Sequence, residues 1–210
     1  MSAISDLFQK GTTVKFKKND FFISPEKKPQ GIYQITEGFV YSYSQSPSHK
    51  KRIQTILKKG DIFPIAWTIN NNNARRDMYV QALTDGSALT IEKKVFLDYI
   101  TNSQKAALEV IDVLLMYLSV YVDRVENLEY DTVREKLINR LLSFIQRFGY
   151  KRGKTVEINL PLTHKFIAES ISVSRENVTR ELNALENEKV ISFKNHQLII
   201  NDSKLLKNNS

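Results

Sequence analysis

The sequence predicts an α+β fold in three parts: an N-terminal antiparallel β-roll, one long helix and a C-terminal winged helix-turn-helix. Short alternating segments bounded by turn residues fill residues 12 to about 95. A stretch without glycine or proline follows, with apolar residues at helical spacing. The last third holds two capped-helix patterns and then a hairpin pattern. We expect the parts to span residues 1–102, 103–130 and 131–210.

The composition fits ordinary globular domains. Of the 210 residues 41% are hydrophobic, and the net charge of +8 with a pI near 9.5 is compatible with a nucleic-acid partner. Much of this charge lies in "KFKKND", "PEKKPQ" and "SHKKRIQTILKKG", which are typical of solvated loops, so charge alone is weak evidence. The lack of cysteine excludes disulfides and cysteine-bound clusters. No stretch has the roughly 18–20 apolar residues that span a bilayer, and no signal-peptide pattern opens the chain, so we expect a cytoplasmic protein with no membrane partner.

Alternation of apolar and polar residues predicts the strands of the β-roll. "TTVKFKKND" places Val14 and Phe16 on one face, and "GIYQITEGFVYSYS" does the same for Tyr33 and Ile35 before a turn at Gly38. "KRIQTILKKGDIF", "MYVQALTDG" and "SALTIEKKVF" continue the series. With no helical crossover between them, these segments predict an antiparallel barrel or sandwich, and the asparagines at 70–73 predict a loop tip.

The helix predicted from about Ser103 to Glu129 carries a coiled-coil seam. Its apolar residues alternate in steps of three and four. They are Leu108, Ile111, Leu115, Leu118, Val122 and Val125. Val113, Leu114 and Tyr121 widen the apolar surface, so one side can pack on the β-roll while the seam meets a second copy. The alternative is a helix buried entirely in its own domain.

Local capping signals predict the helices of the last part. Thr132 with Glu135 fits a capping box, and Gly149 is a plausible end for that helix. Thr163 can cap a short helix in "LPLTHKFIAESI", and Ser174 can cap the next one in "SVSRENVTRELNALENEKVI". Two helices joined by a short turn form the helix-turn-helix pattern.

The second helix of this pair has an apolar and a polar face. Its apolar residues are Val178, Leu182 and Leu185, and its polar residues are Arg175, Glu176, Thr179 and Arg180. Arginine can bridge the O6 and N7 atoms of guanine, and glutamate can accept from the amino group of cytosine. The polar face is therefore suited to reading double-stranded DNA. The alternatives are a merely solvated charged face and a winged helix used for protein contacts.

A wing and several phosphate contacts complete this prediction. "VISFKNHQLIIN" shows two apolar runs about a polar turn, and "TVEINLPL" predicts a further strand before the helices. Residues near the expected DNA backbone can position the protein without reading sequence. They are Thr163, Lys165, Ser174, Lys194 and His196.

The whole order resembles the cyclic-AMP receptor/fumarate–nitrate regulator (Crp/Fnr) family of transcription factors. "SRENVTRELNALENEKVI" is similar to the family's recognition helix, and "GIYQITEGFVYSY" and "LKKGDIF" resemble its β-roll turns at Gly38 and Gly60. The resemblance implies a cyclic-nucleotide-binding-like β-roll, a homodimer and RNA polymerase as a partner. It makes Arg175, Glu176 and Arg180 the base-reading trio, with Thr179 at the variable position.

The chain departs from those family members that bind a cyclic nucleotide. They carry a glycine–glutamate pair after the "GD" turn and an arginine before a small hydroxyl residue later, whereas "GDIFPIAWTI" and "ARRDMYVQA" stand here. Pro64-Ile65 replaces the pair, and Asp77 after Arg76 would repel a phosphate, so we expect no cyclic-AMP binding. The β-roll could bind another small molecule through Trp67, Arg75 and Arg76, bind nothing and act as a scaffold, or answer to a protein.

The sequence gives no reason to expect an enzyme, a metal or a cofactor. Metal enzymes in jelly-roll-like barrels need several histidine and acidic ligands, but His49, His164 and His196 lie in three different elements. His49 lies in a lysine-rich turn, and we interpret His164 as a surface residue. No glycine-rich phosphate loop or nucleophile elbow is present.

Overall fold

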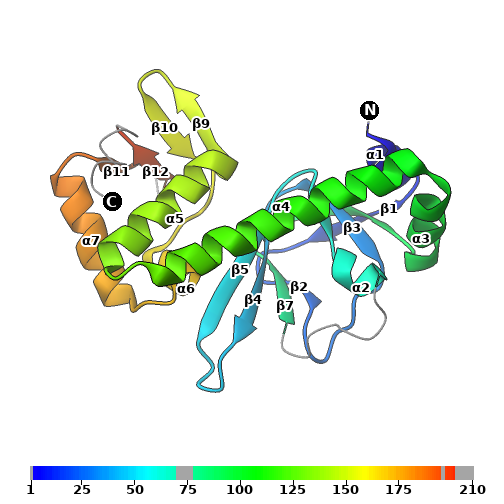
Figure 1. Cartoon of the computed structure of the whole chain (residues 1–210), viewed down its shortest axis with the longest axis horizontal. Helices are drawn as coiled ribbons and strands as arrows, with labels where there is room; N and C mark the ends of the chain where they lie inside the picture. The colour runs from blue at the N-terminus through cyan, green and yellow to red at the C-terminus, as the bar shows by residue number, and fades with distance from the viewer. Residues whose placement is uncertain (1, 70–77, 195–196, 202–210) are drawn as a thin grey trace. The chain divides into compact units, whose positions relative to one another are not determined.

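In the computed structural model of the chain, residues 2–69, 78–194 and 197–201 are described (Figure 1). The chain forms two compact units, which divide the long helix α4 between Val120 and Tyr121. The first unit comprises residues 1–48 with 54–120, and the second comprises residues 49–53 with 121–210. The three-part division expected from the sequence stays a prediction.

The β-roll consists of two four-stranded sheets, and all their residues belong to the first unit except residues 51–53 of β5. Their strand orders are β1-β8-β3-β6 and β2-β7-β4-β5, and β1–β8, β3–β8 and β4–β7 pair antiparallel. The strands are β1 Thr12–Phe16, β2 Phe21–Ile23, β3 Ile32–Glu37, β4 Val40–Gln45, β5 Lys51–Leu57, β6 Ile62–Phe63, β7 Met78–Ala82 and β8 Gly86–Ile91. The expected strand-rich, antiparallel β-roll is confirmed. The predicted asparagine loop tip lies outside the described residues.

Buried aromatic rings and one obligatory glycine fix the β-roll. The Phe22 ring lies 5.1 Å from both Tyr33 and Phe63, centroid to centroid, in edge-on contacts. Gly38 has a φ of +82°, and a Cβ atom there would lie 2.4 Å from the Asp85 carbonyl oxygen. The turn predicted at Gly38 therefore requires glycine.

Three short helices in this unit were not expected from the sequence. They are α1 Ala3–Phe8, α2 Ile65–Ile69 and α3 Lys93–Asn102. The prediction that "SALTIEKKVF" forms one strand is wrong in its second half, because β8 ends at Ile91 and Glu92 precedes α3 as its N-cap residue. Residues 93–96 form a helix and not a strand because α3 places the fully buried side chain of Phe96 in the core.

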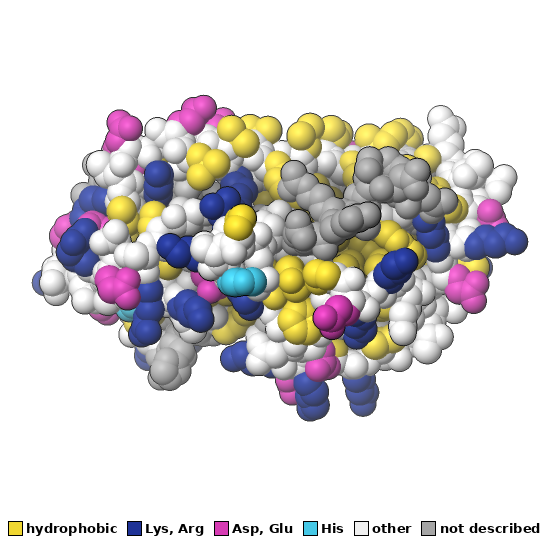
Figure 2. Space-filling model, turned by 90° about the horizontal axis from the view of Figure 1, so that it is seen from below, with side chains coloured by type: hydrophobic (Ala, Val, Ile, Leu, Met, Phe, Trp, Pro, Cys, Tyr) yellow, Lys and Arg dark blue, Asp and Glu magenta, His cyan; other side chains and the backbone are white. Residues whose placement is uncertain are grey.

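Helix α4, Gln104–Glu129, confirms the predicted long helix and has two apolar faces. Ala106 and Val110 are buried against the β-roll, and the Tyr117 hydroxyl donates to the Ile62 carbonyl at 2.8 Å. The six seam residues point elsewhere, with exposed fractions of 47–58%. Burial of α4 in its own domain thus does not account for the seam. In Figure 2 hydrophobic side chains form a row along the upper edge of the view.

The carboxylate of Glu109 joins α4 to the N-terminus of α1. It accepts from the backbone N–H groups of Ala3 and Ile4 at 2.8 and 2.9 Å and from the Ser2 hydroxyl at 2.6 Å. Burial raises the pKa of Glu109, but these hydrogen bonds and Lys105 outweigh it, so the pKa is lowered. A lowered pKa in the folded state stabilises the fold above the carboxyl's unfolded pKa, and this contribution is lost as the pH falls through the folded value.

We therefore expect Glu109→Gln to lower the melting temperature at neutral pH by about 2–4 °C. The difference from wild type should shrink as the pH falls into the range where Glu109 is protonated. Thermal melts followed by circular dichroism at several pH values measure both. Glu126→Gln, at an exposed position of the same helix, is the control, and an equal shift in both variants would contradict the role of Glu109.

The second unit combines three helices with a small sheet. The helices are α5 Val133–Phe148, α6 His164–Ile171 and α7 Arg175–Asn187. The sheet order is β11-β12-β10-β9, with β9 Gly149–Arg152, β10 Thr155–Ile158, β11 Ile191–Lys194 and β12 Gln197–Ile200. The predicted strand before the helix-turn-helix is β10, and the predicted wing is the antiparallel pair β11–β12. The α+β fold class is confirmed.

The predicted caps of this unit are present. Thr132 accepts from the Glu135 N–H while the Glu135 carboxylate accepts from the Thr132 N–H, and Gly149 is the C-cap of α5. Leu137 and Leu141 are fully buried. No helix in the described ranges is both long and apolar enough to cross a membrane.

Candidate nucleic-acid interface

Helix α7 is oriented by its cap and by its apolar face. The Ser174 hydroxyl accepts from the Asn177 backbone N–H at 3.2 Å, which starts the helix. Val178, Leu182 and Leu185 have no exposed surface. Because these three side chains are fixed in the core, the opposite side of α7 is held toward solvent.

The four predicted base-reading residues lie together on this exposed side. Arg175, Glu176, Thr179 and Arg180 line one shallow open hollow. Asn183 lines it too, although the sequence prediction missed it; its position four residues after Thr179 was the available signal. The asparagine amide can pair with the N6 and N7 atoms of adenine. The site therefore presents arginine, glutamate, threonine and asparagine groups over one surface.

Weak contacts leave Arg180 available. Its side chain is 71% exposed, with Nε 3.7 Å from Glu181 Oε1 and Nη2 3.5 Å from Asn177 Oδ1. Glu181 also lies 3.8 Å from Arg134 of α5, and that arginine pairs with Glu188 at 2.5 Å. The α5–α7 contact thus does not depend on Arg180.

The predicted phosphate contacts lie at helix starts and on the wing. The Thr163 hydroxyl accepts from the Phe166 N–H at 3.1 Å, so it caps α6 as Ser174 caps α7. Each of these exposed hydroxyls keeps its own proton as a possible donor. Lys165 and Lys194 are also exposed, and His196 lies outside the described residues. These DNA contacts stay predictions.

His164 is not a simple surface residue, and that interpretation was wrong. It is half-buried at the start of α6, and its Nδ1 atom lies 3.0 Å from Thr179 Oγ1. Its ring centroid lies 5.7 Å from that of Phe193 on the wing. The crossing of α6 and α7 brings these residues together, which local sequence does not reveal. His49 is exposed, as expected.

Trp67 makes packing contacts within the first unit. Trp67 packs against the core, and the Lys93 ammonium lies 4.6 Å from its ring centroid and donates to its carbonyl at 3.0 Å. Arg75 and Arg76 lie outside the described residues. The predicted effector pocket therefore stays a prediction.

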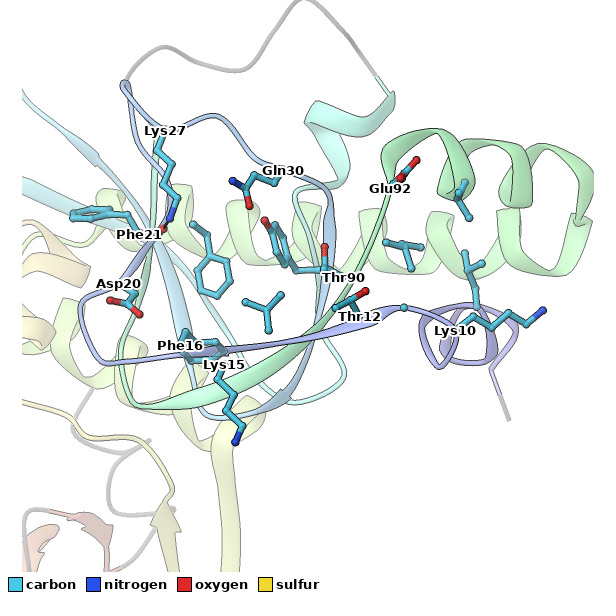
Figure 3. A pocket seen from close by; sticks show the side chains of 17 residues that line it. Lys10, Thr12, Lys15, Phe16, Asp20, Phe21, Lys27, Gln30, Thr90 and Glu92 are labelled. Atoms are coloured by element: carbon cyan, nitrogen blue, oxygen red, sulfur yellow. Dashed lines mark hydrogen bonds between the residues drawn. The ribbon is translucent and has the colours of Figure 1, made fainter.

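A cavity of about 660 Å³ lies elsewhere in the first unit (Figure 3). Its lining combines aromatic and polar side chains, among them Phe21, Tyr33 and Gln30, and it does not include Trp67. Burial raises the pKa of Tyr33, against the effect of the Gln30 backbone N–H. In Figure 3 the side chains of Lys10 and Lys15 reach outward from the cavity.

Two family models match the chain. A cyclic nucleotide-binding domain covers residues 13–103, and a Crp-like helix-turn-helix domain covers residues 135–208. The chain belongs to the Crp/Fnr family. The resemblance inferred from the recognition helix is thereby confirmed. This Crp/Fnr protein is a Crp-like transcription regulator whose helix-turn-helix domain binds DNA.

Similar proteins support the same assignment. The CRP-like cAMP-activated global transcriptional regulator of Mycobacterium tuberculosis is 22% identical over 98% of this chain and 91% of that protein. The global nitrogen regulator of Nostoc sp. is 22% identical over 88% of this chain and 83% of that protein. FixK2 from Bradyrhizobium japonicum shares the fold, with a TM-score of 0.80 at 19% identity over 95% of this chain and 97% of that one.

The Crp/Fnr relatives named here are regulators, not enzymes. Within residues 2–69, 78–194 and 197–201, no group of three or more histidine, aspartate or glutamate side chains is placed to hold a metal ion.

Proposed function

We propose that this Crp/Fnr protein acts as a homodimer that reads an inverted-repeat DNA operator. Two copies would pair along the α4 seam and place two α7 helices about 34 Å apart, one turn of the DNA helix. Arg175, Glu176, Thr179 and Arg180 would read bases in each half-site. RNA polymerase, which the family likeness implies, is the expected protein partner.

The observation that carries this proposal is the exposed set of residues on α7. A capped helix holds two arginines, an acid, a threonine and an amide over one hollow on its exposed side. These groups can form hydrogen bonds with base edges in the major groove. A face that is only exposed to solvent does not require this combination of side chains. The exposed seam on α4 supports the pairing of two copies. Its large apolar side chains have coiled-coil spacing, so burying them against the same seam of a second copy is energetically favourable.

Selection of purified protein on random duplex DNA, at one salt concentration and without added ligand, tests the proposal. Enrichment of a palindrome with half-site centres about 10 base pairs apart would support a dimeric reader. Absence of enrichment from protein shown to be dimeric, with and without cell-extract metabolites, would contradict it.

We further propose that cyclic AMP is not the effector. Where nucleotide-binding members of the family carry a glutamate, this chain has Ile65, which is 3% exposed and packs in the core with α1 and α3. An isoleucine offers no oxygen to a ribose hydroxyl.

Accordingly, cyclic AMP at millimolar concentration is expected to change neither the melting temperature nor the operator affinity. Differential scanning fluorimetry and a fluorescence-anisotropy titration measure the two, with a known cyclic-AMP-binding protein as positive control. A rise in melting temperature that saturates with cyclic AMP would contradict the proposal.

A further inference from the structure

One imidazole ties the candidate recognition helix to its neighbours. His164 is the first residue of α6, its Nδ1 atom lies 3.0 Å from Thr179 Oγ1 on α7, and its ring meets Phe193 on β11. Thr179 also lines the hollow that holds the predicted base-reading residues. A residue that the sequence placed at the surface thus contacts one of the groups proposed to face DNA.

This hydrogen bond controls what the Thr179 hydroxyl can offer to a base. A hydroxyl has one proton to donate and two lone pairs to accept with. If Nδ1 carries a proton, His164 donates to Thr179, and the hydroxyl proton can turn outward to a base acceptor. If Nδ1 is unprotonated, the hydroxyl donates to His164 and can only accept from a base. The presence or absence of a proton on Nδ1 therefore decides whether Thr179 can pair with an acceptor or only with a donor on the base edge.

We infer that His164 is a positioning residue that sets, through Thr179, the base preferred at one position of each half-site. The inference rests on the proposed operator reading and deepens it. With the proton on Nδ1, Thr179 donates outward and favours a base edge with an acceptor there; with the proton on the other ring nitrogen, Thr179 favours a base edge with a donor. The Phe193 contact holds the ring in this orientation.

The test compares five proteins on operator libraries that vary one position at a time, at one salt concentration. His164→Phe keeps an aromatic ring beside Phe193 without the hydrogen bond, His164→Asn places an amide near the Nδ1 position, and Thr179→Val removes the hydroxyl at constant shape. The other two are wild type and the double variant His164→Phe/Thr179→Val. We expect His164→Phe and Thr179→Val to lose about three- to tenfold discrimination at the same single position. The double variant should lose no more than either single variant, and His164→Asn should restore part of the loss.

A loss equal at every position, losses that add in the double variant, or a His164→Phe protein with unchanged preference would each overturn the inference while the wild type still selects a palindrome. A wild type that selects no palindrome would overturn the proposed function as well. Thermal melts of each variant confirm that it is folded.

Discussion

Glutamate at both Leu115 and Leu118 is expected to convert the proposed dimer into monomers and to weaken operator binding about a hundred- to ten-thousand-fold. The two side chains are 56% and 58% exposed and stand in the middle of the α4 seam. In a paired coiled coil these positions lie between the helices, where an ionised carboxylate without a partner is strongly unfavourable. A monomer then binds only one half-site and loses the gain from holding two sites together.

Sedimentation velocity measures the oligomeric state, and fluorescence anisotropy on the selected operator measures affinity. Val95→Glu is the matched control, because it places the same charge on an apolar side chain of α3 that is 46% exposed and outside the seam. The control should stay dimeric and keep wild-type affinity. If the Leu115/Leu118 variant sediments as a dimer, the seam assignment is wrong.

Helix starts were predictable because their causes are local. Thr132, Thr163 and Ser174 each accept a hydrogen bond from a backbone N–H three residues later in the chain. A short hydroxyl side chain can reach only that far, so the sequence already contains both partners. The turn at Gly38 is equally local, because its positive φ excludes most other residues.

Short helices in the β-roll were not predictable in the same way. Helix α2 has five residues, and α3 begins with a lysine pair followed by Val95 and Phe96, a pattern too short to distinguish a helix from a strand. Isolated helices of this length are marginal in water, so tertiary burial of Ile65 and Phe96 decides them. Burial of that kind depends on residues distant in the chain.

In the candidate site, too, local features were predictable and a contact between helices was not. Spacing along one helix placed Arg175, Glu176 and Arg180 on a common face, and the structure brings them to one hollow. The contact of His164 with Thr179 spans 15 residues and arises from how α6 crosses α7. Periodicity describes each helix separately and carries no information on that crossing.

The second large effect is expected from Arg180→Ala, which should cost about 1–3 kcal/mol of base discrimination in each half-site. The side chain is 71% exposed on the α7 hollow, and its polar atoms lie 3.5 Å from Asn177 Oδ1 and 3.7 Å from Glu181 Oε1. Arg134 and Glu188 continue to join α5 to α7 in its absence. The variant should therefore fold normally and lose preference at one position of each half-site. Repeating the DNA selection and titrating single-base operator variants measure this loss.

Lys194→Ala is expected to have a different effect. Comparing it with Arg180→Ala distinguishes sequence-specific base contacts from sequence-independent attraction to DNA phosphates. Lys194 is exposed at the end of β11, where it is predicted to meet a phosphate. Its loss should weaken binding to all sequences alike and reduce the slope of log affinity against log salt by about 1 per subunit. Lys59→Ala, which removes an exposed charge from the first unit, controls for net charge. Removal of a base contact must change the preference among bases. If Arg180→Ala instead weakens binding to all sequences equally, with the selected operator still preferred, Arg180 contacts the DNA backbone and the base-reading assignment is wrong.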